Sequence, residues 1–232
     1  MRVLTKLRLS VIIPVYNEEY NIGNVLDEIM QIIGIEDELI VIDDGSTDRT
    51  VEVVEKRKVR VIRHIANQGK GFCLREGIGI ATGDLVLFID GDGQDDPADI
   101  PKLISPFYEG TDFVNGSRWL GSFQEGAISW LNFFVTTLIT KAINILFNAN
   151  ITDSQAGFRC FRKDKLKGMK LVSNKYEIET EMLIKAIKHG LKIVEIPVKR
   201  FKRPVGESKL RRLQTGTRIL WVILKEKLLN RY

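Results

Sequence analysis

The sequence predicts an α/β protein whose central sheet is mostly parallel and carries helices on both faces. Between residues 9 and 110, short apolar runs rich in β-branched residues alternate with segments of helical periodicity. This alternation is typical of parallel βαβ units. Polar residues gather where the apolar runs end, which is the edge at which open α/β sheets bind ligands. A content of 44% hydrophobic and 28% charged residues is that of a globular domain.

The first four predicted strands are separated by three helices. Residues 9–16 read LSVIIPVY, a continuous apolar run expected of a strand that is buried on both faces. Residues 18–33 follow with apolar side chains at helical spacing. The alternation continues with strands at 38–44, 59–64 and 85–90 and helices at 46–56 and 70–81.

The second half of the chain is predicted to hold longer helices. Its elements are a helix at 98–110, a strand at 112–119, a helix within 126–153, a turn and strand at 154–163, a helix at 176–190, a strand pair at 191–201 and a helix at 207–232. We expect all of them to form one domain over residues 1–232.

The helix within 126–153 is apolar, but its polar residues recur every three or four positions and mark one face. That face holds Ser129, Asn132, Thr136, Thr137, Thr140, Lys141, Asn144 and Asn148. The opposite face holds Trp130, Leu131, Phe134, Leu138, Ile139, Ile145 and Leu146. The segment is therefore expected to be an amphipathic helix rather than a membrane span. It either packs on the domain core or lies in a membrane interface.

Positive charge is concentrated near the C-terminus. The net charge of the chain is +5, yet residues 198–232 hold eleven Lys and Arg against two Glu, a net +9. The helix at 207–232 combines these cations with apolar residues and Trp221, which is typical of a helix on a membrane surface. No aromatic–basic interleaving supports nucleic-acid binding. The partner predicted for this end is therefore an anionic membrane or ligand, and not a nucleic acid.

The segment DGDGQDDP, residues 90–97, places four aspartates directly after a predicted strand. Asp90 and Asp92 leave an extended chain on the same side, so they can share one Mg²⁺ or Mn²⁺ ion. Gln94 can add a neutral oxygen to the site, and the glycines between them allow a tight turn. The last two aspartates precede a proline and are expected to cap the next helix.

The other strand ends offer groups that suit a nucleoside diphosphate. Tyr16 can lie against a planar base, and Glu18 and Asp44 can accept hydrogen bonds from a base or a ribose. Lys70 and the backbone N–H groups of ANQGKG, residues 66–71, can contact phosphates. Four distal cations can neutralise a second phosphate, namely Arg118, Arg159, Arg203 and Lys209.

Six segments together resemble one known family. They are SVIIPVYNEEYNI, IVIDDGSTDRT, NQGKGFCLREGIGIATGDLVLFIDGDGQDDP, NGSR, DSQAGFRCF and RPVGESKL. The chain resembles the family 2 glycosyltransferases over residues 9–229, and the last two segments resemble the dolichyl-phosphate mannose synthases and other polyprenyl-phosphate sugar transferases. The resemblance implies a GT-A-type nucleotide-sugar-binding sandwich. It would comprise a nucleotide-sugar half at 1–117 and an acceptor half at 118–232, with interfacial helices at 126–149 and 208–229.

The resemblance also implies roles for individual residues. The nucleoside pocket would be lined by Pro14, Tyr16, Glu18, Ile42 and Asp44. The rest of the nucleotide sugar would be bound by Lys70, Asp90, Gly91, Asp92, Gln94, Arg118, Arg203 and Lys209. Catalysis would rest on Asp92, Arg118 and Arg203, and the metal on Asp90, Asp92 and Gln94. The acceptor phosphate would contact Lys141, Ser154, Gln155 and Arg159.

The implied reaction is an inverting, metal-dependent transfer of one hexose to dolichyl or polyprenyl phosphate. Mannose from GDP-mannose is the expected donor, and UDP-glucose or another UDP-sugar is the alternative. Residues 129–140 lack the arginine that the family often carries in its first interfacial helix, which leaves the acceptor contacts open. Many relatives continue into transmembrane helices, whereas this sequence ends at Tyr232. We therefore expect a peripheral protein on the cytoplasmic face of a membrane, with a truncated sequence or an anchoring partner protein as the alternatives.

Three rival classes fit the sequence less well. A polysaccharide synthase of the same fold would carry a Gln-x-x-Arg-Trp motif, which is absent. A nucleotidyltransferase would show a glycine- and arginine-rich loop after its first strand, where this chain has PVYNEE. A non-catalytic membrane-surface binding protein would explain the amphipathic helices but not the acids at the strand ends.

Overall fold

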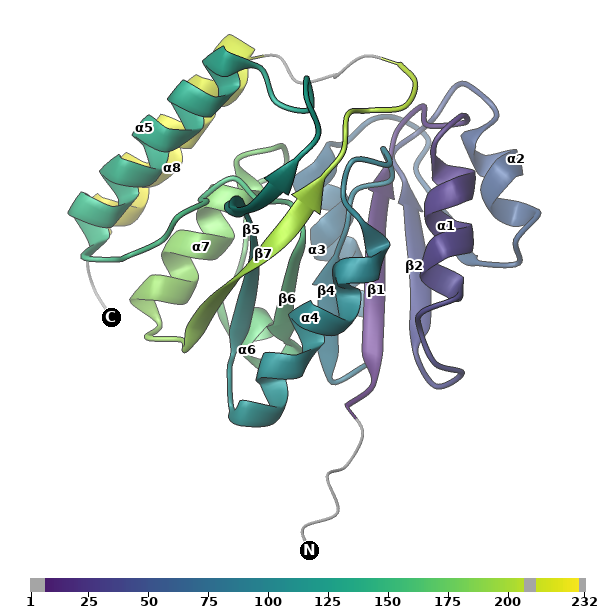
Figure 1. The fold of residues 1–232 in the computed structure, drawn as a ribbon, viewed down its shortest axis with the longest axis horizontal. Helices are drawn as coiled ribbons and strands as arrows, with labels where there is room; N and C mark the ends of the chain where they lie inside the picture. The colour runs from purple at the N-terminus through teal and green to yellow at the C-terminus, as the bar shows by residue number, and fades with distance from the viewer. Residues whose placement is uncertain (1–6, 207–211, 230–232) are drawn as a thin grey trace, which may run out of the picture.

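Seven strands form one mixed sheet in the order β3-β2-β1-β4-β6-β5-β7 (Figure 1). The computed structural model describes residues 7–206 and 212–229. Only β6 runs antiparallel to its neighbours β4 and β5, and the other pairs are parallel. The strands are β1 (Leu9–Val15), β2 (Glu38–Asp43), β3 (Arg60–Arg63), β4 (Leu85–Phe88), β5 (Phe113–Phe123), β6 (Arg159–Arg162) and β7 (Ile193–Arg200). The predicted fold class is confirmed.

Helices cover both faces of the sheet. On one face lie α1 (Ile22–Met30), α2 (Thr50–Glu55), α4 (Ile100–Ile104) and the short 3₁₀ helices η1 (Pro97–Asp99) and η2 (Ser105–Glu109). On the other lie α3 (Lys70–Ile80), α6 (Lys163–Gly168) and α7 (Ile178–Lys188), followed outward by α5 (Trp130–Phe147) and α8 (Arg212–Leu228). Each face has its own apolar core, because the strands are apolar on both sides.

Several elements differ from their predicted form, among them the helix expected at 98–110, which is divided into η1, α4 and η2. The strand pair expected at 191–201 is the single strand β7. It tolerates Pro197 because β7 is at the edge of the sheet, where a missing N–H breaks no ladder. The helix expected at 46–56 begins only at Thr50, because the Asp48 carboxylate binds Thr50 in a local turn. Helix α6 was not predicted, since its six residues are too few to show a helical period.

Helix α5 turns its polar side toward the protein and its apolar side outward. Thr140 and Ile143 are its buried residues, whereas Trp130, Leu138 and Ile145 are 78%, 59% and 82% exposed. Much of the apolar face is therefore exposed, but Ile139 and Leu146 of that face pack against the domain core, so the sequence-based alternative of packing on the core holds for part of the helix. By length and composition alone, α5 would suffice to cross a membrane. Contact with a membrane stays a prediction.

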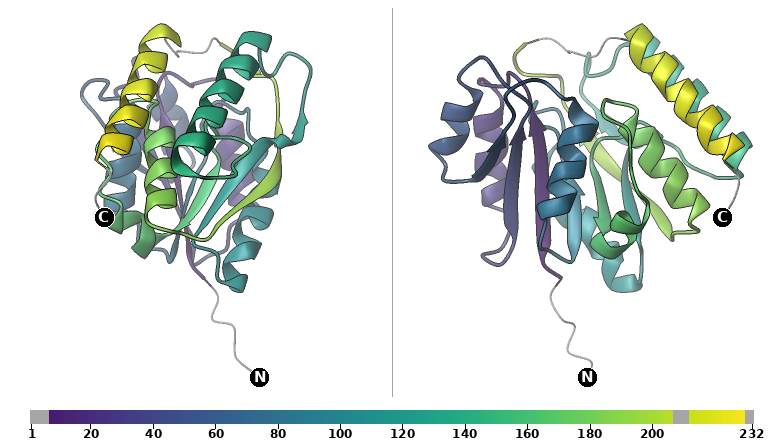
Figure 2. Two further views of the ribbon diagram at one scale, coloured as in Figure 1. Left: turned by 90° about the vertical axis from the view of Figure 1, so that its left-hand side faces the viewer. Right: turned by 180° about the vertical axis from the view of Figure 1, so that it is seen from behind.

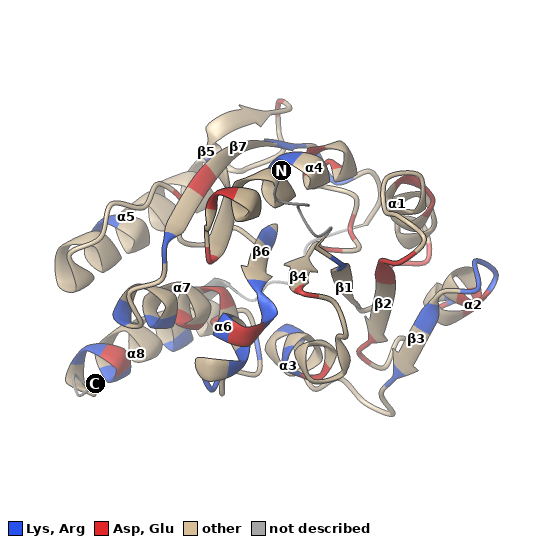
Figure 3. Cartoon of the chain, turned by 90° about the horizontal axis from the view of Figure 1, so that it is seen from below, with Lys and Arg blue, Asp and Glu red and all other residues tan. Residues whose placement is uncertain are grey.

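Helix α8 lies beside α5 and packs on α7 (Figure 2). Lys188 of α7 binds Glu226 of α8 at 2.8 Å, and Lys227 donates to the Leu146 carbonyl of α5 at 2.6 Å. Helix α5 is almost free of charged residues, while α8 presents several, as Figure 3 shows. Exposed apolar side chains continue from α5 onto α8, so the two helices form one apolar ridge at the side of the sheet.

Candidate active site

The predicted metal-binding aspartates lie at the carboxyl edge of the sheet, at its centre. Strand β4 lies between β1 and β6, and Asp90 and Asp92 follow directly after it. The turn depends on glycine. A Cβ on Gly91 would lie 2.6 Å from the Val15 side chain, and Gly93 has a φ of +71°. The sequence therefore folds back here and presents both carboxylates beyond the end of the sheet.

Asp90 is held by a lysine that it shares with a second carboxylate. Lys70, the first residue of α3, lies 2.6 Å from Asp90 and 2.7 Å from Glu179 of α7. Burial lowers the pKa of Lys70, but the two carboxylates outweigh it and the pKa rises above its ordinary value. Burial raises the pKa of Asp90, but Lys70 outweighs that effect and the net pKa is lowered. Sequence reasoning missed Glu179, which carries no signal beyond its place at the start of a helix.

Asp92 lies close to two other carboxylates. Burial, with Asp90 and Asp95 beside it, raises the pKa of Asp92 to about 6, although neighbouring arginines oppose the shift. Arg203 lies 3.4 Å from Asp92 and also pairs with Glu18. Arg203 therefore joins the metal-binding turn to the nucleoside side of the predicted site. The predicted catalytic pair Asp92 and Arg203 is brought together.

Arg118, the third predicted catalytic residue, is held by a carboxylate that the residue predictions did not include. Its guanidinium forms two bonds with Asp153, at 2.7 and 2.8 Å. Asp153 is fully buried. Burial raises the pKa of Asp153, but Arg118 outweighs it and the net pKa is lowered. The charge of Arg118 also helps to lower the pKa of Asp90, so Arg118 faces the same cluster. The sequence could have indicated Asp153 as a site residue, because Asp153 begins the motif DSQAGFR.

Gln94 is turned away from the predicted metal site. Its amide oxygen accepts from Arg200 at 3.0 Å, and its amide nitrogen donates to the Phe201 carbonyl at 3.1 Å. Arg200, which sequence reasoning missed, also binds Asp95 at 2.8 Å. The predicted ligand role of Gln94 is therefore not supported, because β7 engages both ends of its amide. Asp95 is an ion-pair partner rather than a cap, whereas Asp96 caps the next helix as predicted, accepting from an N–H at 3.0 Å.

Asp44 and the loop before α3 hold one another instead of facing a nucleotide. The Asp44 carboxylate accepts from the N–H groups of Gln68 and Gly69 at 2.7 and 2.8 Å and binds His64 at 3.0 Å. The start of α3 is covered by residues 173–175, and the Phe72 N–H donates to a carbonyl there at 3.1 Å. In this conformation Asp44 and the N–H groups of Gln68 and Gly69 are bonded to one another, and the contacts of Asp44 with the nucleoside and of ANQGKG with phosphates stay predictions.

Of the other residues predicted to line the nucleoside pocket, some are partly exposed and one lies in the core. Pro14 is half-buried on β1 opposite Ile42 of β2. Ile42 is fully buried in the core on the α3 side, so its predicted place on the pocket wall is not supported. Tyr16 is half-buried just after β1. Asp43, which was not predicted, is fully buried and one of its oxygens, Oδ1, has no hydrogen-bond partner. An unsatisfied buried oxygen of this kind is a candidate acceptor for a nucleoside N–H or O–H.

Three of the residues predicted for the acceptor phosphate lie together, but they are bonded to one another and to neighbouring groups of the protein. Arg159 is buried, donates to the carbonyls of Glu179 and Ser154, and has a pKa lowered to about 10 by burial. Its predicted phosphate contact is wrong, since the guanidinium is used inside the protein. Ser154 is also buried. Gln155 donates to Thr180 at 2.8 Å, Lys141 is exposed on α5, and Lys209 lies outside the described residues.

The carboxylate turn fits a divalent cation. Burial, together with the negative charges of Asp90 and Asp95, raises the pKa of Asp92. Mg²⁺ and Mn²⁺ typically take only one or two protein carboxylates and complete their shell with phosphate and water oxygens. Asp90 and Asp92 would hold such an ion. Its binding would relieve the repulsion that the arginines only partly offset.

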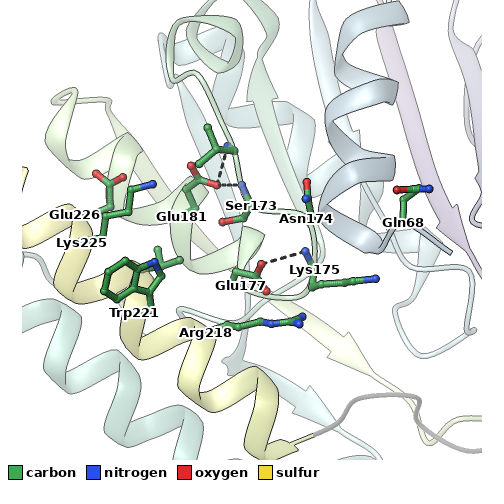
Figure 4. Close-up of a pocket in the computed structure, with 12 residues that line it drawn as sticks. Gln68, Ser173, Asn174, Lys175, Glu177, Glu181, Arg218, Trp221, Lys225 and Glu226 are labelled. Carbon is green, nitrogen blue, oxygen red and sulfur yellow. Dashed lines mark hydrogen bonds between the residues drawn. The ribbon is translucent and has the colours of Figure 1, made fainter.

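A separate cavity of about 370 Å³ lies between α8 and residues 172–177 (Figure 4). Its wall includes Glu177 and Glu181 of the α7 region and Arg218 and Trp221 of α8. Glu181 accepts from the N–H groups of residues 172 and 173 and binds Lys185 at 2.7 Å. Gln68 of the ANQGKG segment also lines this cavity, and we assign the cavity no role in the reaction.

The fold and the site together define a class of protein. Two carboxylates lie at the carboxyl edge of a mostly parallel sheet. Arginines from β5 and from the segment after β7 lie near them. This arrangement suits a metal-bound nucleoside diphosphate. Residues 10–169 match the model of the family described as "Glycosyl transferase family 2". The chain belongs to this family and is a glycosyltransferase.

Relatives and solved structures agree with that membership. The chain is 34% identical over 215 residues to the dolichol-phosphate mannosyltransferase of Pyrococcus furiosus, covering 88% of this chain and 60% of that protein. It is 31% identical over 244 residues to the UDP-N-acetylglucosamine–dolichyl-phosphate N-acetylglucosaminyltransferase of Methanococcus voltae, covering 95% and 96%. The glucosyl-3-phosphoglycerate synthase of Mycobacterium tuberculosis, solved with Mn²⁺ and UDP-glucose, superposes with a TM-score of 0.76 at 25% identity and covers 97% of this chain and 80% of that one.

Proposed function

We propose that the protein transfers one sugar from a nucleoside diphosphate sugar to the phosphate of a polyprenyl lipid at a membrane surface. The observation that carries the proposal is the nearness of two unlike features. The acid and arginine cluster around Asp92 and Arg118 lies at the carboxyl edge of the sheet. The outward apolar face of α5 begins at Trp130, twelve residues along the chain from Arg118. A lipid whose phosphate must reach the first and whose chain must stay in an apolar phase fits both.

The chemistry needs charge more than it needs a base. A phosphate monoester with a second pKa of about 6 is largely dianionic at neutral pH, so it can act as the nucleophile without losing a proton to the protein. In a direct displacement, its oxygen bonds to the anomeric carbon as the bond from that carbon to the diphosphate breaks. An α-linked donor then gives a β-linked product.

The residues around the turn supply that charge. Two anions repel each other as they meet, and Arg118 and Arg203 can offset the repulsion by binding phosphate oxygens. A divalent cation on Asp90 and Asp92 would neutralise the departing diphosphate. Arg203 now pairs with Asp92 and Glu18, so binding the donor would exchange those carboxylates for phosphate.

Two nucleotide sugars are candidates for the sugar donor. GDP-mannose is our first candidate, supported by the 34% identity to the dolichol-phosphate mannosyltransferase. A UDP-sugar is the second, favoured by the relative that matches over 96% of its length and is named for UDP-N-acetylglucosamine. A thermal-shift screen of GDP, UDP and their sugars with Mn²⁺ separates them. Stabilisation by UDP alone would overturn the first candidate.

The transfer itself is tested with polyprenyl phosphate in vesicles and Mn²⁺. Replacing Asp92 with alanine should reduce sugar transfer by about a hundredfold or more, in line with loss of charge stabilisation in a transition state. Turnover near that of the wild-type protein would refute the assignment of Asp92. A peripheral position on the cytoplasmic face of a membrane and an anchoring partner remain predictions from the sequence. Flotation of the protein with and without vesicles tests whether it binds a membrane surface by itself.

A further inference from the structure

Helix α5 is joined to the loop at residues 151–155 by four hydrogen bonds. The Asn144 amide donates to the Ile151 carbonyl at 2.8 Å and accepts from its N–H at 3.0 Å. The Thr140 and Ser154 hydroxyls are hydrogen-bonded to each other at 2.8 Å, and the Thr140 hydroxyl also accepts from the Ser154 N–H at 3.2 Å. Thr140 and Ser154 are both buried, so water does not compete for their bonds. Helix and loop therefore form one hydrogen-bonded unit.

The same loop holds Arg118. Asp153 lies between the two anchored residues Ile151 and Ser154, and its carboxylate accepts three bonds from Arg118, one from the backbone N–H and two from the guanidinium. Arg118 is thus attached to α5 through Asp153 and its neighbours. The far side of the loop is held by Glu195, which accepts from the N–H groups of Thr152 and Asp153 at 2.6 and 3.2 Å.

The polar anchors matter because α5 is buried so little elsewhere. Thr140 and Ile143 are its buried residues, and most of its apolar side chains face outward. Thr140 and Asn144 lie on the polar face of the helix, where they hydrogen-bond to the loop that carries Asp153. Apolar side chains near the C-terminal end of α5 pack on the core, and the two polar side chains add a specific link to this loop.

We propose that Thr140 and Asn144 are positioning residues through which α5 sets the place of Arg118 at the reacting phosphates. The proposal rests on the proposed function, since it concerns the same site. It goes further in coupling the helix that faces the membrane to the transfer step. A displacement of α5 is passed through Ser154 and Asp153 to the guanidinium, and a shift of about 1 Å at such a group is enough to slow a reaction strongly.

The experiment compares three variants of the full chain. Thr140→Val keeps the shape of the side chain and removes the hydroxyl. Thr140→Ser keeps the hydroxyl and should restore the wild-type behaviour. Thr137→Val is the matched control, because the Thr137 hydroxyl donates to the Phe133 carbonyl at 2.8 Å within the same helix. The Thr140 hydroxyl makes the same kind of bond to Thr136 at 2.9 Å, so the two valine variants differ in the contact with the loop.

The main measurement is sugar transfer to polyprenyl phosphate in phosphatidylcholine vesicles. We expect Thr140→Val to lower kcat by about 10- to 100-fold, with vesicle binding unchanged, and Thr137→Val and Thr140→Ser to stay within about twofold of the wild type. A purely structural role would lower the melting temperature and leave the kcat of the folded fraction intact. Equal kcat for Thr140→Val and Thr137→Val would overturn the proposal, as would a failure of Thr140→Ser to restore activity.

A second measurement does not depend on activity. The Arg118 guanidinium lies over the Trp119 ring, 5.2 Å from its centre, so Trp119 fluorescence reports on the position of Arg118. Replacing the other two tryptophans, Trp130 and Trp221, with phenylalanine leaves Trp119 as the single reporter. In that background we expect Thr140→Val, but not Thr137→Val, to change the emission maximum. If the wild type transfers no sugar, the proposed function fails, and identical emission in both variants would then refute the positioning role separately.

Discussion

Replacing Asp92 with asparagine should stabilise the protein in the absence of metal and nucleotide, although it removes a residue that we propose takes part in transfer. Burial and the carboxylates of Asp90 and Asp95 raise the pKa of Asp92 from 3.8 to about 6. The folded state therefore disfavours the charge that Asp92 carries at neutral pH. A shift of about two pKa units corresponds to about 3 kcal/mol, and this is an upper limit for the gain, because asparagine also loses the ion pair with Arg203.

The sign of the effect makes it testable by pH. Because the folded pKa of Asp92 is raised, the wild type is least penalised below about pH 4, where the carboxyl is protonated in both states, and loses stability as the pH rises through about 6. Urea unfolding should show Asp92→Asn more stable by up to about 3 kcal/mol at pH 7.5, or roughly 5 to 10 °C in Tm, with the gap closing near pH 4. Asp96→Asn is the matched control, since asparagine also caps a helix, and it should change stability little. A variant no more stable than the wild type at pH 7.5 would refute the electrostatic reasoning, as would a gap of equal size at both pH values.

Four further outcomes follow from the packing and the charges. Lys70→Met leaves its two carboxylate partners, Asp90 and Glu179, buried without a cation. It should lower the free energy of unfolding in urea by about 3 kcal/mol, and an unchanged midpoint would contradict the ion pairs of Lys70. Gly71→Ala places a Cβ 2.5 Å from the Ser173 carbonyl and should destabilise by about 1–3 kcal/mol, so a neutral result in the same assay would show that residues 173–175 can move. Two carboxylates outweigh burial and raise the pKa of His64, so His64→Gln should cost more stability at pH 6 than at pH 9, and a pH-independent cost would exclude a charged imidazole. Leu138→Glu should weaken vesicle flotation by about tenfold or more without changing Tm, and full retention would argue against α5 as the membrane contact.

The strand ends were predictable because their chemistry is local. Asp90 and Asp92 need only the period of a strand to lie on one side, and Gly91 and Gly93 need only their small size to allow the turn. The hydrogen bonds of Gln94 and of the loop before α3 were not predictable, because they depend on distant segments of the chain. Whether an amide oxygen or a backbone N–H is free depends on β7 and on residues 173–175, which the chain brings back much later.

The sequence by itself determined the alternation of strands and helices, the carboxylate pair at the centre of the sheet edge, and the two faces of α5. Each of these depends on spacing within one segment. Only the tertiary structure decided which face of α5 turns inward, and which carboxylate holds Lys70, Arg118 and Arg203. A periodic pattern states which residues share a face of a helix or strand. It does not state what that face meets, because charge pairs between distant segments are chosen by the packing of the whole domain.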